Sequence, residues 1–99
     1  MSFKIKIEPE VVDDIQNGIA WYNKHQAGLG KRFLSEVKLH INLLKTNPFF
    51  QIRYDKVRCL PLRSFPFMIH FTINESDNLV IIRAVFSTNR NPKIWKQRK

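Results

Sequence analysis

Three strands in succession are predicted within residues 57–92, and this stretch limits the possible fold more than any other part of the chain. Over residues 67–73 a bulky apolar side chain occupies every second position, which is the period of a strand with one face against a core. Residues 79–86 are apolar except for one arginine, a pattern typical of a strand inside its sheet. The first strand, residues 57–62, contains Pro61, which indicates an edge or a bulge.

The one charge inside the last of these strands is Arg83, which has to reach a surface or meet a partner. His70 lies on the face of the middle strand that does not carry the bulky apolar side chains, and Arg58 lies in the first strand. We predict that Arg58, His70 and Arg83 share the face of the sheet that points away from the helices. The N-terminal half of the chain would then support that face.

The N-terminal half predicts one strand and two helices. Residues 2–8 alternate as a short strand at or near the edge of a sheet. Pro9 begins the first helix, and residues 23–30, with two glycines, end it. The second helix covers residues 31–45. Acidic side chains early in the first helix are expected to complement the positive end of its dipole, and they are Glu10, Asp13 and Asp14.

These elements predict an α+β fold. An N-terminal strand is followed by an antiparallel helical hairpin, which packs on one face of a four-stranded, mainly antiparallel sheet. Residues 51–54 are a candidate for a short additional strand. We expect residues 1–99 to form a single domain, with residues 90–99 as a basic C-terminal tail.

The sequence predicts a cytoplasmic protein without a membrane segment. Cys59 is the only cysteine, so an intrachain disulfide is impossible, and this fits a reducing compartment. No apolar run approaches the ~20 residues that span a bilayer.

Charge is concentrated in the strand half of the chain. The formal net charge is +9, from 17 basic and 8 acidic residues. Residues 1–52 contribute +2 of this charge and residues 53–99 contribute +7. An uneven positive field of this kind favours an anionic partner, which could be RNA, DNA or an acidic protein segment.

The residue types permit metal-free phosphate chemistry and little else. The histidines and the cysteine lie on different predicted elements, so we predict no metal site, and no glycine-rich loop suggests a cofactor. Histidine can move a proton at a ribose hydroxyl, and arginines can stabilise charge on phosphate. His70 and Arg83 are therefore candidate catalytic residues, but the sequence shows no acid partner for His70, and this favours a histidine that only fills the sheet surface beside Thr72. Candidate phosphate-binding residues are Arg58, Arg63, Arg83 and Arg90.

The chain resembles the RelE/ParE superfamily of type II toxin–antitoxin toxins, in the ParE-like branch. The resemblance rests on the order of elements and on four phrases: GLGKRF, LLKTNP, VRCLPLRSFPF and AVFSTNRNPKIW. It implies a growth-inhibiting toxin that forms an oligomer with a cognate antitoxin, whose C-terminal segment wraps the toxin's helices and sheet. RelE-like members cleave mRNA in the ribosomal A site, whereas ParE-like members inhibit DNA gyrase.

Departures from the RelE pattern favour the ParE-like reading of the resemblance. Where RelE-like ribonucleases carry basic residues or a histidine, this chain has Cys59, Pro61, Met68 and Ser87. Arg58, Arg63, Arg90 and Trp95 would then contact the target. One alternative is a ribosome-dependent, metal-independent endoribonuclease that uses His70 with Arg58, Arg83 and Arg90. Another is a basic nucleic-acid-binding module without a toxin role.

Overall fold

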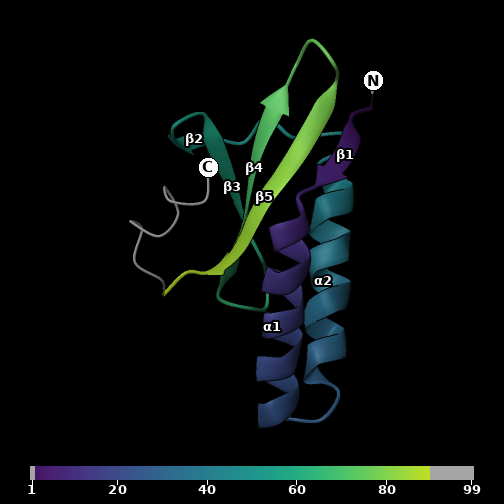
Figure 1. Cartoon of the computed structure of the whole chain (residues 1–99), viewed down its shortest axis with the longest axis vertical. Coiled ribbons are helices and arrows are strands. Elements are labelled where there is room, and N and C mark those ends of the chain that lie inside the picture. Colours follow the sequence, from purple (N-terminus) through teal and green to yellow (C-terminus); the bar gives the residue numbers. More distant parts are fainter. Residues whose placement is uncertain (1, 90–99) are drawn as a thin grey trace.

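The computed structural model describes residues 2–89, which form two helices and five strands. Figure 1 shows the two helices side by side, extending beyond one end of the sheet. In chain order the elements are β1 (Lys4–Ile7), α1 (Pro9–His25), α2 (Leu29–Leu43), β2 (Ile52–Tyr54), β3 (Val57–Pro61), β4 (Phe67–Asn74) and β5 (Leu79–Ser87).

The sheet has the strand order β1-β5-β4-β3-β2, and only β1 runs parallel to its neighbour. The predicted α+β class and the edge position of the first strand are confirmed. The predicted number of four strands was wrong by one, because residues 52–54 pair with β3 and make a fifth strand at the other edge. β5 lies between β1 and β4, as the apolar pattern of residues 79–86 predicted.

The helical hairpin packs on one face of the sheet, as predicted. α1 begins at Pro9, where the missing N–H has no partner to lose. The link to α2 turns at Gly28, whose φ of 86° lies in the left-handed region that glycine adopts without strain. The second helix begins two residues before the predicted Lys31 and ends at Leu43.

The core lies between the hairpin and the sheet. On β4 the alternation predicted from the sequence is confirmed, because Ile69 and Phe71 are buried in the core while Phe67 and Ile73 pack against it. On β5 the alternation is interrupted by a bulge. His70 pairs with Ala84 and Phe71 pairs with Ile82, so Arg83 is an extra residue on β5. Buried core residues of the helices and the sheet include Val11, Phe33, Val37, Ile41, Leu44, Leu60, Ile69, Phe71, Val80, Ile82 and Val85.

Candidate functional site

The face of the sheet that points away from the helices, called the outer face below, is divided into a buried half and a more exposed half. Thr72 and Arg83 lie in the exposed half and are partly accessible. In the other half five side chains from β3, β4 and β5 are buried: Cys59, Met68, His70, Ala84 and Phe86. The outer face is therefore not an open cationic surface along its whole length.

His70, the predicted catalytic base, lies in the buried half with 0% of its surface exposed. Its Nδ1 atom is 2.9 Å from the hydroxyl of Tyr54 and 3.4 Å from the sulfur of Cys59. Burial raises the pKa of the Cys59 thiol to about 11, although the charge of Arg53 acts in the opposite direction. Proton transfer to an RNA substrate would require His70 to become uncovered, because a general base must reach the proton it abstracts.

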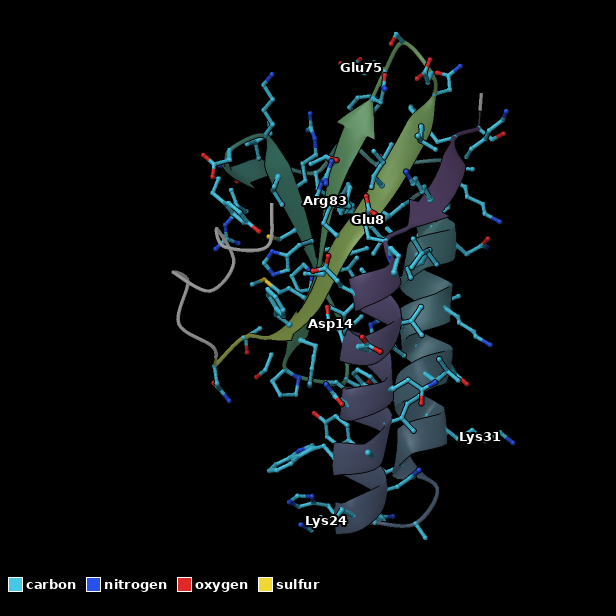
Figure 2. The ribbon with its side chains drawn as sticks, viewed as in Figure 1. Glu8, Asp14, Lys24, Lys31, Glu75 and Arg83 are labelled. Atoms are coloured by element: carbon cyan, nitrogen blue, oxygen red, sulfur yellow. The ribbon has the colours of Figure 1, made fainter. Side chains whose placement is uncertain are left out.

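Arg83 lies at the surface of the exposed half. Its Nε atom donates a hydrogen bond to the Thr72 hydroxyl at 3.0 Å, and its Nη1 atom is 3.9 Å from a carboxylate oxygen of Glu8. Figure 2 shows Arg83 and Glu8 close together where β5 passes the start of α1. Both side chains are about one-third exposed, so this pair resembles a surface ion pair more than a buried one. A shallow hollow of about 570 Å³ adjoins Arg83 and is also lined by Asp55, Lys56, Val57, Thr72 and Ile73.

Arg58 does not share the outer face with His70 and Arg83, and this part of the prediction was wrong. Arg58 pairs with Phe71, whose side chain is in the core, whereas Cys59 pairs with His70. The side chain of Arg58 therefore points to the helix side, because neighbouring residues of a strand face opposite ways. There it donates to the Phe50 carbonyl at 2.6 Å and lies over the ring of Phe49.

Arg63, another predicted contact residue, is separated from Arg83. Arg63 is exposed in the loop between β3 and β4, which lies at the opposite end of β4 from Thr72. That loop is tied to α2 by Glu36, which accepts a hydrogen bond from the Ser64 N–H at 2.7 Å. Burial acts to raise the pKa of Glu36, but hydrogen bonds from Ser64 and Arg63 and the charge of His40 lower it overall. Arg90 and Trp95 lie outside the described residues.

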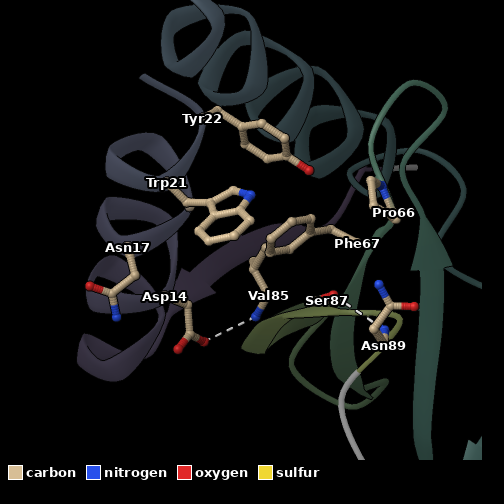
Figure 3. Close-up of a pocket in the computed structure, with 10 residues that line it drawn as sticks. Asp14, Asn17, Trp21, Tyr22, Pro66, Phe67, Val85, Ser87 and Asn89 are labelled. Atoms are coloured by element: carbon tan, nitrogen blue, oxygen red, sulfur yellow. Dashed lines mark hydrogen bonds between the residues drawn. The ribbon is translucent and has the colours of Figure 1, made fainter. Parts of the chain in front are cut away.

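A groove between α1 and the sheet was not predicted from the sequence (Figure 3). It has a volume of about 460 Å³. Trp21 is 56% exposed at one wall, and Asp14 at the same wall accepts a hydrogen bond from the Val85 N–H at 3.0 Å. Asp14 and Trp21 are seven residues apart and so lie on one side of α1, a spacing that was readable in the sequence. Other lining residues are Asn17, Gly18, Tyr22, Pro66, Phe67, Ser87 and Asn89.

The groove lies where the edge of β5 is not covered by another strand. β1 pairs only with residues 79–82, so within residues 2–89 the rest of the β5 edge has no neighbouring strand. Asp14 satisfies one backbone donor on that edge. Asp14 therefore does more than complement the helix dipole, and of the three acidic residues only Glu10 is in the first turn of α1.

Neither a metal-binding cluster nor a membrane-spanning helix occurs among residues 2–89. Within residues 2–89 no group of three or more His, Cys, Asp or Glu side chains could hold a metal ion. Neither of the two described helices is long and apolar enough to cross a membrane.

Comparison with known proteins gives matches in structure only. No protein-family model and no curated protein matches the sequence. A structure of the chromosomal ParDE toxin–antitoxin system from P. aeruginosa matches with a TM-score of 0.78 and 13% identity, over 87% of this chain and 96% of that chain. A mutant of the E. coli toxin RelE in the free state matches with a TM-score of 0.62 and 9% identity, over 99% and 95%.

A third structure, the archaeal RelE–RelB complex from Pyrococcus horikoshii, matches with a TM-score of 0.52 and 18% identity, over 92% of this chain and 100% of that chain. All three identities are low, so the similarity concerns the path of the backbone and the order of its elements. The chain has the fold shared by ParE and RelE toxins.

Proposed function

We propose that this chain is the toxin of a type II toxin–antitoxin pair and that it acts in the ParE manner, by binding an essential cytoplasmic target such as DNA gyrase. The observation that carries the proposal is the complete burial of His70 beneath Tyr54 and beside Cys59. A ribonuclease would need its proton-transfer group at the surface, whereas a toxin that acts by binding needs only a complementary surface.

The environment of the arginines also supports binding over catalysis. Arg58 donates to a backbone carbonyl on the helix side, and Arg83 is shared between Thr72 and Glu8. Stabilising a phosphorane requires donors that are already aimed at the place where charge develops. Arginines that are aimed at protein oxygens, on opposite faces of the sheet, would first have to be released.

The groove beside α1 suits the cognate antitoxin. An extended segment could place apolar side chains against Trp21, Tyr22 and Phe67 while its backbone runs along the uncovered edge of β5. The ParDE and RelE–RelB structures are of toxins with their antitoxins, which supports a protein partner here as well. We expect the two chains to purify together as an oligomer, and Trp21→Ala to weaken their association.

The proposal is tested by a supercoiling assay with purified protein. We expect inhibition of gyrase by the wild-type chain at micromolar concentration, reversed by the antitoxin, and growth arrest on induction in cells. Growth arrest without inhibition of supercoiling, but with cleavage of mRNA on ribosomes, would overturn the ParE-like assignment. It would favour the RelE-like alternative instead.

Arg83 is the observation that favours the RelE-like alternative as a second candidate. It is the one predicted catalytic residue that the structure leaves partly exposed on the outer face. Arg83→Ala would then abolish mRNA cleavage while Arg63→Ala, in a distant loop, would not. A third outcome would show that the chain is a nucleic-acid-binding module without a toxin role. In that case it would cause no growth arrest, and it would bind DNA or RNA with an affinity that falls steeply as the salt concentration rises.

A further inference from the structure

The strand β2 is short and lies at the edge of the sheet. It has three residues, and within residues 2–89 its strand neighbour is β3, with a pairing that is irregular between Ile52 and Tyr54. The turn between β2 and β3 places Asp55 and Lys56 at φ values of 44° and 73°, a left-handed conformation that costs energy in residues other than glycine. Figure 1 shows β2 at the edge of the sheet away from β1. The backbone pairing alone therefore holds β2 weakly.

The side chain of Tyr54 gives β2 a second attachment. The Tyr54 hydroxyl is 2.9 Å from Nδ1 of His70, and the centroids of the two rings are 5.8 Å apart. His70 belongs to β4, so the tyrosine reaches across β3 to make this contact. Ile52 and Arg53, the other two residues of β2, are exposed. The contact between Tyr54 and His70 is therefore the main side-chain attachment of β2 to the buried half of the outer face.

The groups around His70 make a positive charge at this position unfavourable. From β3 the Cys59 sulfur is 3.4 Å from Nδ1, and with a pKa of about 11 this thiol stays neutral between pH 5 and 8. From β5, Ala84 pairs with His70 and the Phe86 ring lies 5.4 Å from the imidazole, and neither side chain titrates. From β2, Arg53 brings a positive charge that acts on Cys59. A charged imidazole here would be buried and would lie near a like charge.

From this arrangement we propose that β2 is a pH-sensitive latch, which detaches from the outer face when His70 takes up a proton. Histidine is the side chain whose charge ordinarily changes between pH 5 and 8. The detached form gives the charged imidazole access to water, so it binds more protons than the closed form, and a falling pH favours it. The helices and the other four strands should stay in place, because the core lies on the opposite face of the sheet. The inference does not depend on the toxin assignment.

The experiment measures amide hydrogen exchange of the full chain by NMR between pH 7.5 and 5.0. This range lies above the ordinary pKa values of carboxylates, about 4. Protection factors are compared, because they correct for the pH dependence of the exchange chemistry itself. We expect the amides that pair β2 with β3 to lose up to about thirtyfold of their protection, the limit for one group with a pKa of about 6.5 in the detached form. Amides of β4 and β5 should keep theirs.

Variants of the chain assign the effect to two side chains. His70→Asn keeps an acceptor near the position of Nδ1 but cannot take up a proton, so β2 should remain protected at pH 5.0. Tyr54→Phe keeps the ring and removes the hydroxyl, so β2 should be less protected than in the wild type already at pH 7.5. His25→Asn is the matched control, because His25 is exposed on α1, and its pH profile should follow that of the wild type.

A second measurement needs no variant. The ring resonances of His70 are followed by NMR in the wild-type chain, and they should shift over the same pH range in which β2 loses protection. This titration decides the point even where the buried position does not tolerate His70→Asn.

Four outcomes would overturn the inference. The first is protection of β2 in the wild type that is the same at pH 7.5 and 5.0. The second is a loss of protection in His70→Asn equal to that of the wild type. A parallel loss in β4 and β5 would mean that acid destabilises the whole domain rather than β2. Resonances of His70 that stay fixed while β2 opens would assign the pH dependence to another group.

Discussion

The carboxylate of Asp14 accepts a hydrogen bond from the backbone N–H of Val85 at 3.0 Å, and this bond joins α1 to β5 across 71 residues of sequence. It forms just beyond the bulge at Arg83, where the edge of β5 is no longer covered by β1. An unpaired N–H at a partly buried strand edge is costly, and an open edge also invites pairing with other chains. Asp14 therefore stabilises the packing of α1 against β5.

Replacing Asp14 with alanine should destabilise the fold. The Val85 N–H would lose its partner, at a cost of about 1–2 kcal/mol in the free energy of unfolding. For a domain of this size the midpoint of thermal unfolding should fall by roughly 5–10 °C. Asp13→Ala is the control, because Asp13 is the exposed neighbour on the same helix. Equal effects of the two substitutions in urea and thermal unfolding would mean that the bond contributes nothing.

Cys59 should be nearly unreactive in the folded protein. The thiol is 6% exposed, and burial raises its pKa from 9.0 to about 11. The thiolate is the nucleophile, and this shift lowers the thiolate fraction at pH 8 by roughly a hundredfold. Labelling with a disulfide reagent should therefore be slow in buffer and fast in guanidinium chloride.

A surface thiol provides the comparison for Cys59. Ser35→Cys in a Cys59→Ser background places a single thiol on the exposed side of α2. It should react at the same rate in buffer and in denaturant. Rapid labelling of Cys59 in buffer would show that β3 opens readily at this position, and it would also mean that His70 is accessible.

The sequence predicted the layers of the fold and the two faces of β4, but not the face of β3 on which Arg58 lies. The alternation on β4 placed His70 opposite the core correctly, because period two survives wherever a strand is regular. Arg58 was assigned to the outer face by its charge rather than by its pairing. Its neighbour Cys59 lies beside His70, and that contact decides which way Arg58 points. The pairing of strands depends on the whole fold, so it cannot be predicted from the sequence of one strand alone.

The bulge and the groove depend on the same tertiary information. No residue in 79–87 is a turn or glycine signal that would predict the extra residue at Arg83, yet the bulge allows Ile82 and Val85 both to reach the core. The groove exists because α1 crosses the uncovered part of β5. The burial of His70 likewise depends on Tyr54, whose short strand was predicted only as a candidate.

Stability below neutral pH should depend on Glu36. Its pKa is lowered in the folded state, where its carboxylate accepts hydrogen bonds from the loop between β3 and β4. A lowered pKa means that the ionised group stabilises the fold above its unfolded pKa, near 4.5, and that this contribution is lost as the pH falls through the lower folded value. Glu36→Gln should lower the free energy of unfolding at pH 7. At pH ~3 the free energies of unfolding of the variant and the wild type should lie closer together.

The control for Glu36→Gln is the same substitution at Glu75, a glutamate in a turn. Glu75 lies in the exposed loop between β4 and β5, away from the loop that Glu36 holds, and Glu75→Gln should leave the free energy of unfolding at pH 7 close to that of the wild type. Parallel stability curves for Glu36→Gln and wild type between pH 3 and 7 would contradict the assignment of this carboxylate as the anchor of the loop.

Gly30 permits the close approach of the two helices, and alanine there should be destabilising. A Cβ atom at this position would lie 2.6 Å from the Ile19 carbonyl oxygen and 2.8 Å from the side chain of Asn23. Inside a helix alanine is normally favoured over glycine by roughly 0.5–1 kcal/mol, but overpacking costs about 1–3 kcal/mol and should win. Ser35→Ala, at an exposed position of the same helix, should change stability by less than about 0.5 kcal/mol. Urea unfolding of both variants decides the point, and a Gly30→Ala variant more stable than wild type would mean that α1 and α2 can separate without loss of packing.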